Sequence, residues 1–517
     1  MNKATSTISD APMEIPVSET RAIEEPSEAA YASASESWWR IGDFGVFGLW
    51  IAVVAFILPY HEKWADEAQA WLIARDLDLR TIWFHELRYE GSPGLWHTIL
   101  WIAQHVFHAK YGALGYIGMA GATAGVALLI FKAPFPRYIR WPLAFTYFLV
   151  YQYAVIARPY TLFTLFCLVA AMRYRDLTRP GLFALSLFPL AFLTAHGSVV
   201  AAGLAFAYAI KFLQQWRGVD GKVRNSFVIS GLVIVLMYVV LLLILLPPAD
   251  VEATHQEPIT GTIVLYRSLG AIGGALVDNG WISIVLLCIL AGWCYLRRAL
   301  TSLLIPVAFL VILYVYTAGW PHYQGTIFLT VLAGLAIAWP GDDERKKFDA
   351  KQLWEYRGAV AVLAIAIAYQ IYVAAIVIRN EVNLPYSGAA DMTQFLKPYV
   401  AQGKKIYGYQ YGMVAVNANF DHNIFANWPR AYYHHALSES EATLDLNEMR
   451  TSSADYIVIT YWEAWDERKF RGLAVPLANW NYAVAHVSDG YLLSKTGYSH
   501  RQIYFVFKKE IPSGQNQ

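Results

Sequence analysis

Charge and cysteine are both scarce in this 517-residue chain. Asp, Glu, Lys and Arg make up 15% of the residues and hydrophobic residues 57%, and the mean hydropathy is +0.35. A soluble domain typically carries about 25% charged residues, so the composition argues against a soluble enzyme and indicates a multispanning membrane protein. The formal net charge of +1 gives no reason to expect nucleic acid as a partner.

The three cysteines, Cys167, Cys288 and Cys294, all lie in apolar runs without a CxxC motif or a Cys/His metal spacing. We expect them to be small core residues and predict no disulfide. Residues 1–42 are rich in Ser, Ala, Glu and Pro and lack an early apolar run. This composition predicts a disordered cytoplasmic tail, not a signal peptide.

Long apolar runs are abundant. Eleven are long enough, or nearly so, to cross a membrane as helices. They lie at about 43–60, 113–131, 141–157, 160–172, 181–196, 199–215, 226–246, 281–296, 302–318, 323–339 and 358–378. A further run, 94–107, is short and carries His97, Gln104 and His105. We interpret it as a helix lying at the membrane interface.

The connections between these runs alternate between basic and weakly charged. The basic ones are 132–140, 173–179, 211–224, 297–298 and 345–357. Because basic loops stay in the cytoplasm, the alternation predicts eleven spans, a cytoplasmic N-terminus and an exported C-terminus. Counting 94–107 as a span would break the alternation at every later loop.

The predicted architecture has a membrane part, 43–379, with exported loops at 61–112 and 247–280. The tail 380–517 contains "KKIYGYQYG", "DYIVITYW" and "RQIYFVFKK", which are typical of strands. The expected fold class is therefore a polytopic α-helical membrane protein with a small extracytoplasmic α/β domain at its C-terminus.

An acidic pair, Asp66 and Glu67, follows the first apolar run within "WADEAQAWLIARDL". The spacing of Ala68, Trp71 and Leu72 predicts a helix from Ala65 on the membrane surface. Two carboxylates in its first turn either cap the helix and complement its dipole, or they are catalytic.

Other polar residues gather on the same predicted face. They are Arg158 and Tyr160, His196, His322 and Tyr323, and His255, Glu257 and Arg267 of the loop 247–280. Each alone has an ordinary role, such as an interfacial hydrogen bond or a snorkelling side chain. Together they predict a water-filled cavity that holds an anion.

The sequence resembles the GT-C superfamily of membrane glycosyltransferases, and especially its bacterial aminoarabinose transferase and protein O-mannosyltransferase branch. The similar segments, which cover roughly 43–340, are "WADEAQAWLIARDL", "YEGSPGLWHTILWIAQHVF", "YAVIARPYTLFTLFCLVAA" and "FLTAHGSVVAAGLAFAYAI". The tail 380–517 matches no family that we can name.

The resemblance implies an inner-membrane enzyme that moves a sugar, with inversion, from a polyprenyl-phosphate carrier to a glycan, lipid or protein acceptor outside the cytoplasm. Asp66 would act as general base or orient the acceptor hydroxyl. The candidates for the cation at the leaving phosphate are Arg158, Arg267, His196 and His322.

One departure concerns the second acidic residue that relatives often carry where this chain has Arg158 and Pro159. Either Glu67 or Glu257 substitutes for it, or Asp66 acts alone. A divalent metal needs several oxygen ligands, so we predict no metal cofactor, with a divalent cation as the alternative.

Two other functions remain open, a transporter or flippase of lipid-linked sugars and a non-catalytic envelope-assembly protein. The tail is expected to tune acceptor choice through aromatic residues that suit sugar rings, or else those residues form its core. They are Tyr407, Tyr409, Tyr411, Trp428, Tyr432 and Tyr433.

Overall fold

The computed structural model describes residues 28–246, 248, 259–317, 322–433, 446–462, 477–495 and 497–510. The chain divides into two compact units, Met1–Gly45 and Val46–Gln517. The described part of the first unit is the N-terminal half of helix α1 (Glu28–Ile57). All other elements belong to the second unit, and the predicted C-terminal domain 380–517 does not separate from it.

The described residues contain six helices that are long and apolar enough to cross a membrane. These are the segment Arg40–Tyr60, which includes most of α1, the segment Tyr111–Lys132 with α6 (Leu114–Lys132), α10 (Ala195–Gln214), α11 (Gly221–Leu245), α14 (Leu300–Thr317) and α17 (Ala350–Asn383). A bent pair, α12 (Gly261–Leu276) and α13 (Gly280–Leu296), meets at 69° and adds a seventh if it is one span. The protein is thus polytopic by length and composition, although the eleven predicted spans are not confirmed.

The difference from eleven spans arises where the apolar runs are broken. The run 141–157 is divided between α7 (Arg137–Ala144) and a π-helical turn, Phe148–Gln152. Proline lacks a backbone N–H and disrupts a regular helix, and Pro142 lies inside α7. The next run contains only a 3₁₀ turn and the 12-residue helix α8 (Phe163–Tyr174).

Two further apolar runs form helices shorter than a usual span, α9 (Pro180–Ala191) and α15 (Gln324–Ala338). Every residue of α15 from Gly325 to Ala338 is buried. A helix that is apolar on all sides is typical both of a buried core and of a membrane span, so the sequence alone does not distinguish the two.

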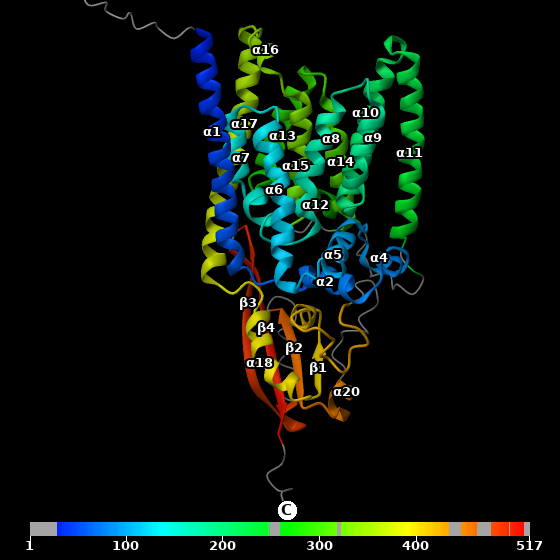
Figure 1. The fold of residues 1–517 in the computed structure, drawn as a ribbon, viewed down its shortest axis with the longest axis vertical. Coiled ribbons are helices and arrows are strands. Elements are labelled where there is room, and N and C mark those ends of the chain that lie inside the picture. The colour runs from blue at the N-terminus through cyan, green and yellow to red at the C-terminus, as the bar shows by residue number, and fades with distance from the viewer. Residues whose placement is uncertain are drawn as a thin grey trace, which may run out of the picture. The chain divides into compact units, whose positions relative to one another are not determined.

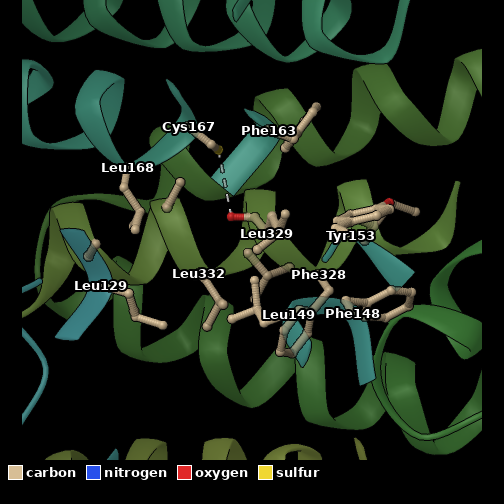
Figure 2. Close-up of a cluster of buried hydrophobic side chains, with 14 of the residues drawn as sticks. Leu129, Phe148, Leu149, Tyr153, Phe163, Cys167, Leu168, Phe328, Leu329 and Leu332 are labelled. Atoms are coloured by element: carbon tan, nitrogen blue, oxygen red, sulfur yellow. Dashed lines mark hydrogen bonds between the residues drawn. The ribbon is translucent and has the colours of Figure 1, made fainter. Parts of the chain in front are cut away.

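Helix α8 packs against α6 and α15, and Phe148 of the turn Phe148–Gln152 contacts Phe328 of α15. Figure 2 shows part of this hydrophobic core, in which Leu129, Phe148, Leu149, Tyr153, Phe163, Cys167, Leu168, Phe328, Leu329 and Leu332 lie together. The Cys167 thiol donates a hydrogen bond of 3.7 Å to the carbonyl of Leu329. All three cysteines are free as predicted, but only Cys167 and Cys294 are buried, whereas Cys288 is exposed.

The segment 61–112 forms a set of short helices. They are α2 (Ala65–Asp76), α3 (Leu79–Thr81), a π-helical turn (Ile82–Glu86), α4 (Leu87–Glu90) and α5 (Leu95–His105). Figure 1 shows α2, α4 and α5 at the end of the helical bundle next to the C-terminal strands, and α16 (Asp342–Arg345) at the opposite end. Helix α5 is not among the candidate spans, and its interfacial position stays a prediction.

The C-terminal part contains a four-stranded sheet in the order β1-β2-β4-β3. Strands β1 (Ile406–Tyr409) and β2 (Tyr456–Trp462) pair in parallel, and the other pairs are antiparallel. The three predicted strands correspond to β1, β2 and β4 (Gly497–Lys509), and β3 (Tyr482–Ser494) was not predicted. Helices α18 (Ala389–Ala401), α19 (Met413–Asn417) and α20 (Leu446–Thr451) complete this part.

The C-terminal part shares a hydrophobic core with α2. Leu72 and Ile73 of α2 cluster with Met413 and Val414 of α19 and with Ile406 of β1. This continuous core explains why both parts belong to one compact unit.

Candidate functional site

A cavity of about 720 Å³ lies where α2, α5, the start of α10 and the C-terminal part meet. Six of the ten predicted site residues line it, although they come from four separate segments of the chain. They are Asp66, Arg158, Tyr160, His196, His322 and Tyr323. The structure therefore brings together most of the residues that the sequence placed on one face.

Asp66 and Arg158 form an ion pair, with Nη1 of Arg158 3.0 Å from Oδ2 of Asp66. The phenol of Tyr411 donates a second hydrogen bond, of 3.1 Å, to Oδ1 of Asp66. Both charged side chains are mostly buried, at 15% exposed for Arg158 and 19% for Asp66. The small exposed surface lets a ligand in the cavity compete for either partner.

Arg158 has an extended backbone at the start of a 3₁₀ turn, Pro159–Leu162. The following proline favours this extended conformation. The guanidinium lies 5.6 Å from the ring centre of Tyr160 and 5.8 Å from that of Tyr323, at cation–π distance. Burial would lower the pKa of Arg158, but Asp66 outweighs burial and raises it, so the group stays positively charged.

Two histidines stand beside this aromatic cluster. Nδ1 of His196 lies 3.0 Å from the phenol oxygen of Tyr160, and the His322 ring is 4.0 Å from the ring of Tyr323. Among the described residues, Nε2 of either histidine has no hydrogen-bond partner. Burial, with Arg158, lowers the pKa of His322 well below its ordinary value. Burial therefore favours the neutral form of His322, and its predicted role as a cation at the leaving phosphate stays a prediction.

Glu67 does not line the cavity. Its Oε1 accepts a hydrogen bond of 2.7 Å from the backbone N–H of Ala157, and its Oε2 accepts one of 3.2 Å from that of Trp64. The Oε2 atom also lies 2.9 Å from Nε2 of His61. Glu67 therefore fixes the start of the helix, whereas Asp66 faces the cavity.

His61 bridges Glu67 and Glu381, since its Nδ1 lies 2.9 Å from Oε1 of Glu381. The phenol of Tyr151 donates a hydrogen bond to the same Glu381 carboxylate. Burial alone would lower the pKa of His61, but Glu67 and Glu381 outweigh it and raise the pKa to about 10. His61 is therefore a buried cation held between two carboxylates, and the sequence analysis did not identify it.

Of the other predicted site residues, Arg267 lies within the described part of the chain and is not on the cavity wall. Arg267 lies in α12, where its Nη1 donates a hydrogen bond of 2.5 Å to the carbonyl of Val315. His255 and Glu257 lie outside the described residues. Their proposed contacts with substrate stay predictions.

Sequence reasoning missed more than half of the polar groups around the cavity. The missed residues that line it include Gln69, Glu90, Trp96, His97, Tyr147, Gln152 and Tyr386. Glu90, Trp96 and His97 lie in the segment "YEGSPGLWHTILWIAQHVF", and this location was the available signal. Of the aromatic residues predicted to meet sugar, only Tyr411 lines the cavity, whereas Tyr409, Trp428 and Tyr432 are buried in the C-terminal core.

The β3–β4 hairpin supplies another part of the wall through Leu492, Leu493 and Ser494. Leu492 and Leu493 pack within the core of the helical bundle. Next to them Lys495 is 4% exposed. Its Nζ donates to the carbonyl of Gly274 and lies 3.2 Å from Asp278 and 2.9 Å from Gln324. The hairpin end is thus inserted between helices of the bundle.

The described residues contain no group of three or more His, Cys, Asp or Glu side chains that is arranged to hold a metal ion. Metal independence stays a prediction. Comparison of the chain with protein-family models, with curated proteins and with solved structures gives no match.

Proposed function

We propose that this protein is an inverting glycosyltransferase of the bacterial inner membrane. It would move a sugar from a polyprenyl-phosphate carrier to an envelope glycan, lipid or protein on the extracytoplasmic face. The observation that carries the proposal is the pair formed by Asp66 and Arg158 on the wall of one cavity. A carboxylate and a guanidinium are the groups that this reaction needs on either side of the sugar.

In the proposed reaction the acceptor hydroxyl attacks the anomeric carbon from the side opposite the phosphate. A bond forms between the acceptor oxygen and that carbon, and the hydroxyl proton passes to Asp66. The bond between the carbon and the phosphate oxygen breaks, and its electron pair stays on the polyprenyl phosphate. Arg158 stabilises the negative charge that grows there, because it can hold two phosphate oxygens at once.

The ion pair between Asp66 and Arg158 implies an order of binding and reaction. When the carrier phosphate binds Arg158, the guanidinium is drawn from Asp66, and the carboxylate becomes available to the acceptor. Tyr411 keeps Asp66 in place through the hydrogen bond to Oδ1. Carrier binding would therefore prepare the base as well as supply the sugar.

The test uses the purified full-length protein and a defined polyprenyl-phosphate sugar. Asp66→Asn keeps the shape of the side chain and removes its charge, so it should abolish turnover while the protein still binds the carrier. A flippase would instead move the lipid-linked sugar across a proteoliposome membrane without releasing polyprenyl phosphate. Carrier binding and turnover that both stay unchanged in Asp66→Asn would contradict the proposal.

A further inference from the structure

One wall of the cavity carries polar groups that the proposed reaction does not use. Glu90 ends α4, and Gly91 follows it with a φ of +59°, a conformation that glycine adopts readily. Gln69 of α2 donates a hydrogen bond of 2.8 Å to Oε1 of Glu90. The backbone N–H of Tyr433 donates to the amide oxygen of Gln69 at 3.0 Å, which fixes the orientation of the amide.

This arrangement leaves the other oxygen of Glu90 open to a ligand. Among the described residues no hydrogen bond is made by its Oε2, and the side chain is partly exposed and lines the cavity. Gln69 also bonds the Tyr433 carbonyl, so both ends of the amide are occupied.

His97, in the first turn of α5, is the second unusual group. It is 3% exposed and lies on the cavity wall. Neither of its ring nitrogens has a hydrogen-bond partner within the described part of the chain. Burying an imidazole without a partner costs free energy, and a ligand in the cavity would supply the missing partner.

Both groups are uncharged near neutral pH. Burial raises the pKa of Glu90 to about 8, and the nearby carboxylates of Glu86 and Asp66 add to it, against the opposite effects of Gln69 and Arg158. Burial lowers the pKa of His97 to about 4. A carboxylic acid and a neutral imidazole each offer one donor and one acceptor. They suit a ligand whose groups also donate and accept, and they give no counter-charge to an ion.

We propose that Glu90 and His97 form a subsite for the hydroxyl groups of an uncharged sugar, with Gln69 holding the Glu90 carboxyl in position. A sugar hydroxyl both donates and accepts, and it therefore matches the two groups in either direction. Trp96, beside His97 on the same wall, adds an aromatic face for the sugar ring. This inference rests on the proposed sugar transfer and specifies the kind of sugar that the cavity takes.

The experiment measures binding to the full-length protein in lipid nanodiscs at pH 7. The probes are polyprenyl-phosphate-linked glucose, bare polyprenyl phosphate and methyl glucoside, with glucosamine in place of glucose as the charged comparison. Glu90→Ala should weaken the binding of at least one glucose probe about tenfold, as for the loss of a hydrogen bond. Glu90→Gln, which stays neutral and polar, should bind within about threefold of wild type. Asp343→Ala, an exposed acid in α16, is the control.

The two sugar probes show which sugar the subsite holds. Weaker binding of the lipid-linked glucose alone indicates the donor sugar, and weaker binding of methyl glucoside alone indicates the acceptor. Binding of glucose should also weaken in wild type as the pH rises through about 8, since Glu90 then loses its O–H. Glu90→Gln should lack this change. Burial also lowers the pKa of Lys495 to about 8. Comparing wild type with Glu90→Gln therefore shows whether Glu90 or Lys495 causes the change in binding.

Three results would overturn the subsite. They are equal losses in Glu90→Gln and Glu90→Ala, no loss in either, or tighter binding of glucosamine than of glucose in wild type. Bare polyprenyl phosphate tests the proposed function separately, because its binding does not depend on the sugar. A wild-type protein that binds no carrier contradicts the glycosyltransferase, whereas one that binds carrier but ignores Glu90 contradicts only the subsite.

Discussion

The phenol of Tyr411 donates a hydrogen bond of 3.1 Å to Asp66, 345 positions earlier in the chain. Tyr411 lies between β1 and α19 of the C-terminal part, and Asp66 lies in the first turn of α2. The C-terminal part thus contacts the proposed catalytic base directly. This contact modifies our expectation that residues 380–517 only tune the choice of acceptor, because the cavity is incomplete without them.

Tyr411→Phe should lower turnover by about tenfold to a hundredfold, because a hydrogen bond to a charged group typically contributes about 1.5–3 kcal/mol. Carrier binding should change little, since the carrier phosphate is expected to bind Arg158. Turnover and carrier affinity are measured separately on purified protein. Tyr407→Phe is the matched control, because Tyr407 is on β1 but does not line the cavity. Equal turnover in both variants would rule out a role for the Tyr411 hydroxyl.

Arg158→Lys should reduce turnover clearly, and Arg158→Ala more strongly. Losing a charged partner of a buried anion costs roughly 2–5 kcal/mol, which is about thirtyfold to several thousandfold. Arg158→Lys should lose less turnover than Arg158→Ala, because lysine keeps the positive charge although it cannot bind two phosphate oxygens in a bidentate manner.

Arg267→Ala is the control for this series, since Arg267 bonds the Val315 carbonyl outside the cavity. From the sequence we expected Arg267 to be the second candidate, with a smaller effect seen mainly as weaker carrier binding, and its position outside the cavity agrees with a smaller change than at Arg158. Wild-type turnover in Arg158→Ala would exclude Arg158 as the phosphate ligand.

The His61 site should make stability depend on pH. Its folded pKa of about 10 exceeds the ordinary 6.5, so its contribution is complete below about pH 6.5 and is lost as the pH rises towards 10. Glu67 makes stability depend on pH in the acidic range. Burial opposes its ionisation, but His61 lowers its pKa overall, so its contribution is lost as the pH falls below the ordinary glutamate range.

Thermal unfolding of wild type and His61→Gln in detergent, from pH 6 to pH 10, checks this prediction. The difference between the two proteins should shrink as the pH rises, because only wild type loses a buried cation. At pH 6 the variant leaves two buried carboxylates without their partner, which should cost about 3–5 kcal/mol. A difference that stays constant over this range would show that His61 is not charged in the folded protein.

Sequence reasoning identified several residues that line the cavity, but it did not show which role each acidic residue has. Asp66 and Arg158 were recognisable because each follows an apolar run in a short, turn-forming segment. The separate roles of Asp66 and Glu67 depend on His61 and Glu381, and Glu381 is 320 positions from His61. No local pattern contains such a contact. Strand β3 escaped prediction because Ser488, Asp489 and Gly490 interrupt its apolar alternation.

The eleven predicted spans stay unconfirmed for a related reason. A run such as 323–339 is as apolar as a membrane span, yet its helix α15 is short and enclosed by other helices. Reporter fusions near residues 135, 176, 220 and 348 should still report the cytoplasm, and those at 255 and 450 the outside. The basic connections support this orientation, and Figure 1 shows α16 at the opposite end of the bundle from α2 and α5. A cytoplasmic reporter at 450 would contradict the exported site.

Lys495 tests whether the β3–β4 hairpin must stay inserted for the cavity to work. Lys495→Met keeps the length and apolar stem of the side chain, but it removes the bonds to the Gly274 carbonyl, Asp278 and Gln324. Leaving buried acceptors unpaired costs about 1–3 kcal/mol each, so Leu492, Leu493 and Ser494 should lose their fixed position on the cavity wall.

We therefore expect Lys495→Met to raise the dissociation constant of the lipid-linked sugar and to make the hairpin easier to cleave by protease in the folded protein. Lys508→Met is the matched control, because Lys508 is exposed on β4, the other strand of the same hairpin. If Lys495→Met bound the donor and resisted protease as Lys508→Met does, Leu492 and Leu493 alone would hold the hairpin in the bundle. The Lys495 bonds would then be a consequence of insertion and not its cause.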